Sequence, residues 1–585
     1  MKRPLPLLRG VRSLHVPWGA VPRTSRSFVR DLPVFAAGLA LFYSVVALAR
    51  YWSGPLTPQV EIDLSPHALP LYAFYSVLRL SVAYLLSLLF TLTYGYVAAY
   101  NPRAEKFMLP LLDILQSIPV LSFLPGVMLA MVALFPRRQL GLELGAILLI
   151  FTGQVWNMAF SFYSSLKSIP EEMREAARLY RFSWWQRFTQ MEVPFSVIGL
   201  VWNSMMSMAG GWFFLTACEM FVLGNRDFRL PGLGSYIQTA ASAGDTRAIL
   251  WGLVTIIGII VLTDQLVWRP VIAWAQKFKF ENVEATDVPR SPVLNLIRHS
   301  TTLAFLTRKT ISPLHEALDL HFARKQIRSP DNAPRSGARQ WLLWLCGVAL
   351  VAGVLYAIFR SGVLLSSLTR SDVSHLFLGA GATFLRVLTS LTIGAIWTIP
   401  VGVLIGTHPR LARVAQPLAQ IAASVPATAL FPVVLLGLMA IGSGIRVGSI
   451  ALILLGTQWY ILFNVIAGAS AIPTDLKEVC SVFHLNRVER WRKLILPAIF
   501  PYLVTGMITA SGSAWNASII AEYFHLKGQI LSTAGLGAVI SQATDDGNFR
   551  LLLAATIVMA AIVVTINRLV WRRLYTLAST RFRLG

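Results

Sequence analysis

Apolar runs long enough to cross a membrane recur along the chain in two sets, and no other feature restricts its fold as strongly. A helix needs about 20 residues to span roughly 30 Å of hydrocarbon. The chain has 585 residues, of which 55% are apolar and only 13% are charged, and its mean hydropathy is +0.61. A soluble protein carries about a quarter charged residues. The sequence therefore predicts an all-α polytopic membrane protein.

We expect about twelve transmembrane helices, six in each half of the chain. The expected spans of the first half are 33–52, 75–99, 107–134, 143–165, 195–224 and 248–270. Those of the second half are 341–359, 383–407, 413–440, 447–467, 498–524 and 550–571. The predicted organisation is a basic cytoplasmic arm (1–31), a first transmembrane domain (32–274), a basic cytoplasmic linker (275–339), a second transmembrane domain (340–574) and a cytoplasmic tail (575–585).

The two halves carry matching residues in the same order, which predicts a duplicated unit. Early in each half the offset is 307, as between Arg79 and Arg386 (386 − 79 = 307). Later the offset is 303, as between Glu219 and Glu522 (522 − 219 = 303). Two six-span units that start on the same side of the membrane form a parallel repeat around a pseudo-twofold axis. Such repeats usually enclose a path between them.

Basic residues predict which side of the membrane each loop occupies. Lys and Arg outnumber Asp and Glu by 51 to 27, giving a formal net charge of +24. They gather in the arm, the linker and the tail, which favours cytoplasmic loops over nucleic-acid binding. Both termini are therefore expected in the cytoplasm. Arg137 and Arg138 fall on the outer side in this scheme and fit it least.

Neither catalysis nor metal binding is expected of this chain. Its three cysteines, Cys218, Cys346 and Cys480, lie in apolar or interfacial surroundings without a CxxC pair, so neither a disulfide framework nor a zinc site is predicted. No paired carboxylates or nucleophile constellation stands out. The sequence also lacks G-x-x-x-x-G-K-[ST], the loop that cradles nucleotide phosphates.

A charged segment lies between the fourth and fifth predicted spans of each half. The proline that follows it stands 19 residues after a glutamate in both copies, from Glu175 to Pro194 and from Glu478 to Pro497 (194 − 175 = 19; 497 − 478 = 19). Charges alternate there with small apolar residues, which is typical of a short helix lying along the membrane surface. The segment is either a connector stabilised by lipid headgroups or a docking element for a partner. Two copies at one spacing, in a chain with no energy-coupling site of its own, favour docking.

The start of each segment has its own signals. Pro170 and Pro473 suit the first turn of a helix, where a missing N–H costs nothing. Ser168 with Glu171 fits a capping box, which the second copy lacks.

These segments resemble the EAA loop of permease subunits of ABC importers, whose pattern is E-A-A, three residues, G, nine residues, then I-x-L-P. The matching residues are Glu175-Ala176-Ala177 with Val193-Pro194, and Glu478-Val479-Cys480 with Leu494-Ile495-Leu496-Pro497. Arg181 and His484 stand where the family has glycine, a residue that permits φ > 0. The wider layout resembles the nitrate/sulfonate/taurine branch, in the form with two fused permease copies.

The resemblance implies a permease of the bacterial inner membrane that moves a small anion by alternating access. It implies two copies of a separate ATPase, which bind the ATP and Mg²⁺, a probable extracytoplasmic solute-binding protein, and contact with membrane lipid. The residues assigned to ATPase coupling are Pro170, Glu171, Glu175, Ala176, Ala177, Arg181, Pro194, Pro473, Glu478, Val479, Cys480, His484 and Pro497. An ion-gradient-driven transporter of six plus six helices is the main alternative, and a membrane scaffold or receptor is another.

Polar groups inside predicted spans are candidates for the translocation path, because they are costly there. Candidates are Arg79, Gln154, Glu219, Arg386, Gln458 and Glu522. Glu219 and Glu522 are expected near the outer face, either as gate residues or paired with Arg226 or Arg229 and with His525 or Lys527. Arg79 and Arg386 either snorkel to the interface or contact an anion. Gln154 and Gln458 either line the path or bond between helices.

Overall fold

Long apolar helices make up the computed structural model, which describes residues 61–135, 139–223, 226–278 and 337–581 and the single residues 313, 317 and 321. Among these residues, eight helices are long and apolar enough to cross a membrane, or ten if each of two bent pairs is one span. The all-α polytopic fold is confirmed, with fewer clear spans than the twelve predicted. The predicted span 33–52 lies outside the described residues, as do Arg137 and Arg138. The span 341–359 falls within α15 (Gly337–Leu365), whose apolar part, Val351–Leu365, is shorter than a span.

The elements of the first half follow one another in a fixed order. They are η1 (Pro66–Ala68), α2 (Leu69–Tyr100), α3 (Pro102–Ser117), η2 (Val120–Phe123), α4 (Leu124–Leu134), α5 (Gln139–Lys167), α6 (Glu171–Leu179), α7 (Trp184–Arg187), η3 (Phe188–Glu192), α8 (Val193–Glu219), β1 (Val222–Leu223), β2 (Arg226–Asp227), α9 (Leu233–Ala243), α10 (Thr246–Thr263), η4 (Asp264–Trp268), α11 (Arg269–Ala275) and η5 (Gln276–Phe278).

After α15, the second half repeats this order. Its elements are α16 (Arg370–Thr407), α17 (Pro409–Ser424), α18 (Ala427–Ala440), α19 (Ile445–Ser470), α20 (Thr474–Val482), α21 (Arg487–Arg490), η7 (Trp491–Ile495), α22 (Leu496–Ala521), β3 (Tyr523–Leu526), β4 (Gln529–Ser532), α23 (Leu536–Asp545), α24 (Phe549–Ile566), η8 (Asn567–Trp571) and α25 (Arg572–Arg581). Each half contains one antiparallel hairpin, β1–β2 or β3–β4.

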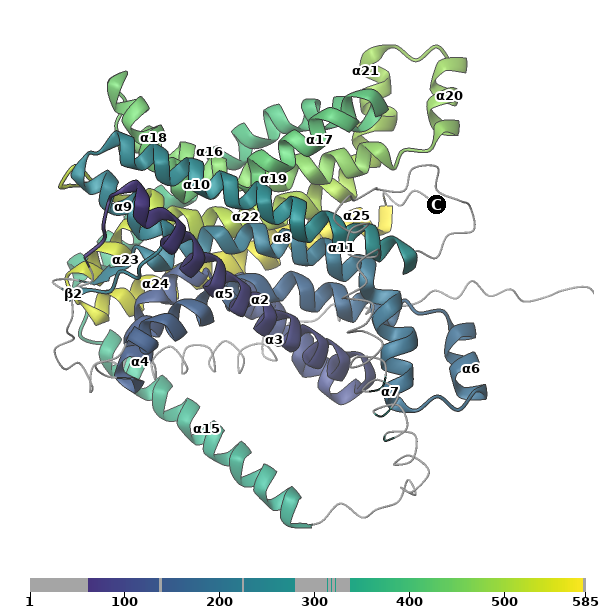
Figure 1. Cartoon of the computed structure of the whole chain (residues 1–585), viewed down its shortest axis with the longest axis horizontal. Coiled ribbons are helices and arrows are strands. Elements are labelled where there is room, and N and C mark those ends of the chain that lie inside the picture. Colours follow the sequence, from purple (N-terminus) through teal and green to yellow (C-terminus); the bar gives the residue numbers. More distant parts are fainter. Residues whose placement is uncertain are drawn as a thin grey trace, which may run out of the picture.

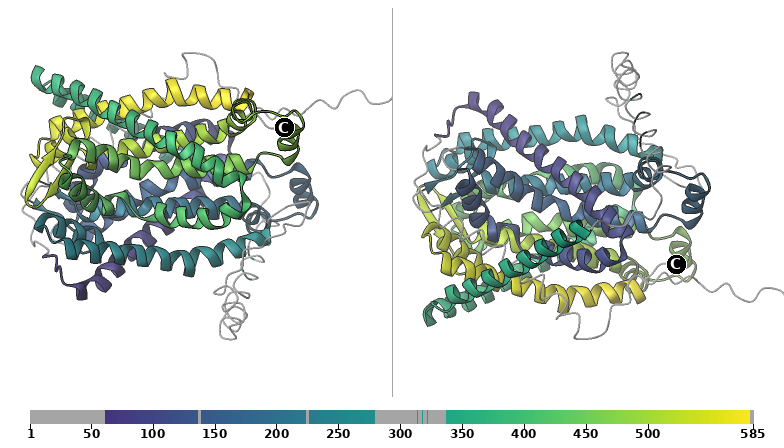
Figure 2. Two further views of the ribbon diagram at one scale, coloured as in Figure 1. Left: turned by 90° about the horizontal axis from the view of Figure 1, so that it is seen from above. Right: turned by 90° about the horizontal axis from the view of Figure 1, so that it is seen from below.

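The two ends of the helix bundle differ. The short helices α6 and α20 both project from one end of the bundle, which we call the α6–α20 end (Figures 1 and 2). Both hairpins and the short helices α9 and α23 lie at the other end, which we call the hairpin end (Figures 1 and 2). α15 runs along the outside of the bundle (Figure 1).

The third predicted span of each half is broken rather than continuous. The helices before and after the break meet at 82° in the first half and 87° in the second. Proline causes both breaks, because the residue before a proline is pushed into extended backbone. Ile118, before Pro119, has ψ 124°, and Val425, before Pro426, has ψ 121°. We call these two breaks the elbows.

The elbows join the two halves. Asn516 of α22 accepts a hydrogen bond from the Leu121 N–H of the first elbow at 3.3 Å. At the second elbow, the Thr428 hydroxyl is bonded to that of Thr216 in α8. α8 packs on α17 and α18, and α22 packs on η2. Each half therefore places one long unbroken helix, α8 or α22, against the broken helix of the other half.

Candidate functional site

The helices α6 and α20 lie at equivalent places and are the predicted surface helices. Pro170 precedes the first residue of α6 as its N-cap rather than standing in the first turn. The predicted capping box is absent, because the Ser168 hydroxyl donates to the Ser165 carbonyl at 3.0 Å and no side chain caps the helix. Instead, Arg174 fixes α6 by donating to the Leu166 carbonyl at the end of α5, at 3.0 Å.

Both helices end in the same left-handed turn. Arg181 has φ 51° and His484 has φ 47°, so these two residues adopt the conformation that the family's glycine would permit. The Phe182 N–H donates to the Ala177 carbonyl at 3.0 Å, and the Leu485 N–H donates to the Cys480 carbonyl at 3.1 Å. This pattern closes a helix C-terminus as a Schellman motif. The missing glycine therefore leaves the turn unchanged.

The faces of the two helices separate the residues assigned to coupling. Glu175, Ala176, Glu478 and Val479 are exposed, together with Glu171. Ala177 and Cys480 are buried instead, and Ala177 packs in a cluster with Leu166 and Met191. Assigning these two small residues to contact with a partner is therefore wrong, because they hold their helices against the protein itself.

Large apolar side chains at the tips of both helices were missed by sequence reasoning. Leu179 is 83% exposed and Tyr180 is 77% exposed. Their equivalents at the offset of 303, Val482 and Phe483, are 72% and 73% exposed. The available signal was an aliphatic–aromatic pair repeated at the end of two charged surface helices. Exposure of such residues at two equivalent places indicates contact surfaces.

Pro194 and Pro497 stand directly before the predicted spans 195–224 and 498–524, and both lie inside longer helices. Continuous helix runs from Trp184 to Glu219 and from Arg487 to Ala521, and Pro194 and Pro497 fall within these ranges. A π-helical turn, η3 or η7, directly precedes each α-helix that contains the proline. Proline has no N–H to donate to the preceding turn, so the helix continues there with a wider hydrogen-bonding pattern.

Among the described residues, one ionic cluster at the α6–α20 end is found in the first half and not in the second. The buried carboxylate of Glu192 lies 2.8 Å from the Arg187 guanidinium and accepts a hydrogen bond from the Tyr100 hydroxyl at 2.7 Å. Arg187 also donates to the Tyr96 hydroxyl at 3.1 Å. The position equivalent to Glu192 holds Ile495 (495 − 192 = 303). Only the first half therefore ties the segment after its surface helix to α2 by charge.

At the hairpin end of the first half, Glu219 is fully buried and fully bonded. It accepts hydrogen bonds from Ser76, from Arg79 and from the Gly234 N–H at 2.7, 2.7 and 2.8 Å. Arg79 also donates to Glu143 at 2.5 and 2.7 Å. The cluster joins α2, α5 and α8 to the first turn of α9.

The second half repeats this cluster with one carboxylate fewer. Glu522 accepts from Thr383, Arg386 and the Gly537 N–H at 2.7, 2.7 and 2.8 Å. Arg386 donates a further hydrogen bond to the Thr533 hydroxyl, where Arg79 donates to a second carboxylate. The place of that acid is taken by the exposed Arg446 (446 − 143 = 303).

These clusters correct the predicted roles of four residues. Glu219 is paired with Arg79 rather than with Arg229, and Glu522 with Arg386 rather than with His525 or Lys527, so these predicted pairings are wrong. The predicted partner Arg226 has a side chain outside the described part of the chain. Snorkelling of Arg79 and Arg386 is wrong as well, because both side chains are turned inward to a carboxylate. Each acid lies against a turn of sequence Gly-Leu-Gly, which comprises residues 232–234 beside Glu219 and residues 535–537 beside Glu522. We therefore assign these four residues to the fold of the hairpin end.

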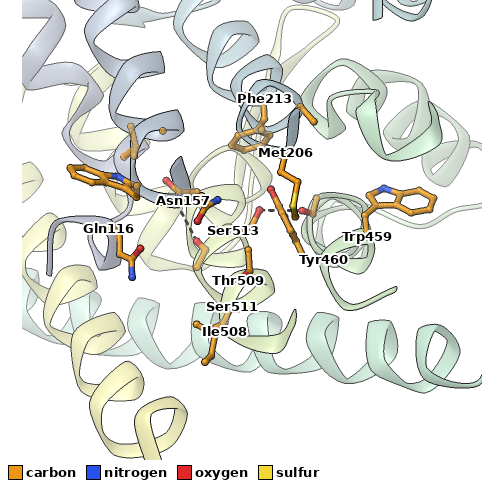
Figure 3. A pocket seen from close by; sticks show the side chains of 18 of the residues that line it. Gln116, Asn157, Met206, Phe213, Trp459, Tyr460, Ile508, Thr509, Ser511 and Ser513 are labelled. Atoms are coloured by element: carbon orange, nitrogen blue, oxygen red, sulfur yellow. Dashed lines mark hydrogen bonds between the residues drawn. The ribbon is translucent and has the colours of Figure 1, made fainter. Parts of the chain in front are cut away.

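A cavity of about 360 Å³ lies between the two halves near the middle of the long helices. Its polar lining consists of Gln116, Ser117, Trp156, Asn157, Trp459, Tyr460, Thr509, Ser511, Ser513, Asn516, Asn567 and Trp571. Figure 3 shows this cavity from close by. None of the six predicted path residues belongs to the lining. Gln154 and Gln458 are buried outside it, whereas their helix neighbours Asn157 and Tyr460 reach it.

A smaller cavity of about 260 Å³ lies between the halves at the hairpin end. His525 and Asp545 line it and lie 3.7 Å apart. Burial raises the pKa of the Asp545 carboxyl, although the Tyr523 hydroxyl donates to it at 2.6 Å. The hairpin β3–β4 closes this end by crossing to the first half, where the Lys527 N–H donates to the Ala241 carbonyl of α9 at 3.0 Å.

Comparison with known proteins matches both halves to one family. The family of binding-protein-dependent transport system inner membrane components matches residues 91–267 and again 398–583. The nitrate import permease protein NrtB of Leptolyngbya laminosa is 29% identical over 195 residues, which are 33% of this chain and 66% of that protein. The bicarbonate transport system permease protein CmpB of Synechococcus elongatus is 27% identical over 262 residues, covering 40% of this chain and 91% of that protein. The putative aliphatic sulfonates transport permease protein SsuC of Bacillus subtilis is 23% identical, covering 45% and 97% respectively.

Substituting the first glycine of each Gly-Leu-Gly turn will destabilise the hairpin end. A Cβ at Gly232 would overlap the Glu219 carboxylate, and one at Gly535 would overlap that of Glu522. We expect Gly232→Ala and Gly535→Ala each to lower the stability of the purified protein by about 1–3 kcal/mol, as overpacking does. Gly258→Ala is the control, because a Cβ there meets nothing within 4 Å. Thermal melting in detergent measures the effect, and equal melting temperatures for all three variants would contradict it.

Because Arg181 has a left-handed backbone conformation, we can predict which residues at position 181 stabilise the turn after α6 and which destabilise it. Arg181→Gly removes a cost of about 1 kcal/mol that an L-residue bears in this conformation, whereas a β-branched residue such as valine bears more. Hydrogen–deuterium exchange over residues 177–182 should therefore be slower in Arg181→Gly and faster in Arg181→Val than in the unmodified chain. Faster exchange in the glycine variant would show that the turn is not left-handed.

Proposed function

The chain belongs to the family of binding-protein-dependent transport system inner membrane components, and from this membership we propose that it is a two-domain permease of an ABC importer for a small anion. Both halves match the family, so one chain supplies the two membrane domains that such a transporter needs. The anion is inferred from relatives named for nitrate, bicarbonate and aliphatic sulfonates.

The observation that carries this proposal is the pair of equivalent surface helices at one end of the bundle. α6 and α20 share their length, their position before the fifth long helix, and the left-handed turn that ends them. Each exposes a glutamate, Glu175 or Glu478, and then an aliphatic–aromatic pair at its tip. A docking surface of this kind combines a central apolar anchor with a charged rim.

The proposed partner is an ATPase, of which two copies dock on one chain. ATP and Mg²⁺ are bound by the ATPase, in keeping with the lack of a phosphate-binding loop motif in this sequence. When two ATP-bound subunits close on each other, they draw α6 and α20 together, and the halves change from one open side to the other. This is the alternating access expected of a permease with a path between its repeats.

The proposed orientation places the α6–α20 end in the cytoplasm of a bacterium. The chain termini lie in the cytoplasm in this orientation, and the hairpin end faces outward, where an extracytoplasmic solute-binding protein delivers the anion. The crossing of β3–β4 onto α9 gives that protein a surface built from both halves.

Variants at the helix tips and the glutamates test the docking surface. Tyr180→Ala with Phe483→Ala, and separately Glu175→Arg with Glu478→Arg, should weaken ATPase binding by about tenfold or more, because a buried anchor or a reversed charge costs more than ~1.4 kcal/mol. The measurement is the amount of Walker-A-bearing subunit that co-purifies with the chain, together with ATP-dependent uptake.

The matched control is Ile530→Ala, which removes another exposed apolar side chain, at the hairpin end. It should leave ATPase binding intact. Unchanged co-purification and uptake in both double variants would refute the docking assignment. Uptake that persists without any ATPase and follows an ion gradient would replace the proposal with a secondary transporter.

A further inference from the structure

The central cavity has no Asp, Glu, Lys, Arg or His in its lining, in the part of the chain that the structure describes. Its polar side chains are hydroxyls, amides and indole N–H groups. This contrasts with a whole chain whose formal net charge is +24. The positive charge of the molecule therefore lies elsewhere, and a solute in the cavity meets neutral hydrogen-bonding groups only.

The polar groups of the cavity are unequally divided between the halves. At the offset of 303, Met206 corresponds to Thr509, Gly210 to Ser513, and Phe213 to Asn516. All six line the cavity, so each apolar position of α8 faces the path where α22 presents a polar one. At these three positions α22 is polar and α8 is apolar, and we call these two helix faces the polar wall and the apolar wall. The polar residues of the first half in the lining are Gln116, Ser117, Trp156 and Asn157.

The hydroxyls of the polar wall lie close to one another. Figure 3 shows Tyr460, Thr509 and Ser513 gathered at the centre of the view, with Met206 and Phe213 above them. Ser513 donates to the Gly456 carbonyl and Thr509 to the Thr505 carbonyl, each at 3.1 Å. Hydroxyl protons rotate freely, so they can turn from a helix carbonyl to an arriving anion.

The opposite wall approaches these hydroxyls without filling the space between. A Cβ added at Gly210 would lie 3.7 Å from the Tyr460 hydroxyl oxygen, which is ordinary contact distance. The gap at this point therefore has room for about one methyl group, and a solute would occupy the wider part of the cavity beside it. A solute placed there can bond to α19 and α22 while its far side touches α8.

The absence of charged groups restricts the charge of that solute. The cost of moving an ion out of water grows with the square of its charge, so a dianion costs about four times as much as a monoanion of the same size. A few neutral donors can offset part of this cost for a monoanion. A dianion would need a fixed positive partner, which this lining does not offer.

We propose that the central cavity is a one-sided substrate site, in which Tyr460, Thr509 and Ser513 of the second half bind a singly charged oxyanion against the apolar wall formed by α8. The proposal rests on the proposed function, which supplies the anion. It adds the residues that bind the solute, the half that provides them, and the exclusion of doubly charged anions.

Uptake by the reconstituted chain with its ATPase and binding protein tests the residues. Thr509→Val and Ser513→Ala should each lower the maximal uptake of nitrate or ethanesulfonate about tenfold, since a hydrogen bond to a charged group is lost. ATP hydrolysis stimulated by the loaded binding protein should stay within twofold of the unmodified complex. Thr505→Val is the control: its hydroxyl also bonds to its own helix, at 3.0 Å from the Pro501 carbonyl, but it does not line the cavity.

Cysteine protection tests the charge limit without selection by the binding protein. Thr509→Cys is made in a chain whose three cysteines are replaced by alanine, and its reaction with a methanethiosulfonate reagent is timed in the full complex. Nitrate should slow the reaction and sulfate at equal ionic strength should not. Val488→Cys, on an exposed residue of α21, is the control that neither anion should protect.

Each outcome separates the two proposals. If the unmodified complex shows no ATP-dependent uptake of any anion, the proposed function fails and the substrate site fails with it. If uptake occurs but Thr509→Val and Ser513→Ala leave it unchanged, or if sulfate protects Thr509→Cys as well as nitrate does, only the substrate site is refuted. A parallel fall in uptake and in ATP hydrolysis would also refute it, because the residues would then act on the fold.

Discussion

A carboxylate buried at the end of α8, and another at the end of α22, organises the hairpin end of each half. Glu219 and Glu522 each bind an arginine, a neighbouring hydroxyl and the first N–H groups of the short helix that follows. Removing one partner of a buried ion pair costs about 3–5 kcal/mol, so the groups around each acid must stay together. In the first half α2, α8 and α9 are therefore fixed as one unit, and in the second half α16, α22 and α23. This leaves the seam between the halves as the place where relative movement costs least.

The seam is formed by the elbows, where few and neutral hydrogen bonds join the halves. Thr216 with Thr428 and Asn516 with Leu121 lie between the central cavity and the smaller cavity at the hairpin end. Neutral hydrogen bonds contribute only about 0.5–1.5 kcal/mol each. The arrangement thus combines ionic clusters within each half with neutral hydrogen bonds and apolar packing between the halves, which suits a membrane protein whose halves move relative to each other.

Sequence reasoning recovered the features that follow from local pattern. The apolar runs gave the long helices, the offsets of 307 and 303 gave the duplication, and the repeated charged segments gave α6 and α20. It failed where partners come from distant helices. Glu219 was paired with its neighbours in sequence, although its partner Arg79 lies 140 residues away. The left-handed turns at Arg181 and His484 were hidden because backbone bonds, rather than glycine, hold them. The angles of the elbows could not be predicted, since the prolines alone do not give an angle.

The halves differ in ways that bear on the proposed mechanism, and the α6–α20 end offers its most direct test. An ionic cluster ties the segment after α6 to α2 in the first half, whereas Tyr460, Thr509 and Ser513 of the cavity belong to the second. Spin labels at Ala176→Cys and Val479→Cys, two exposed and equivalent positions, allow the distance between α6 and α20 to be measured by pulsed electron paramagnetic resonance in the assembled complex. If closure of the two ATPase subunits draws α6 and α20 together, this distance will shorten when ATP binds to a hydrolysis-deficient ATPase and lengthen again without nucleotide. An unchanged distance in a complex whose active form imports anions would contradict it.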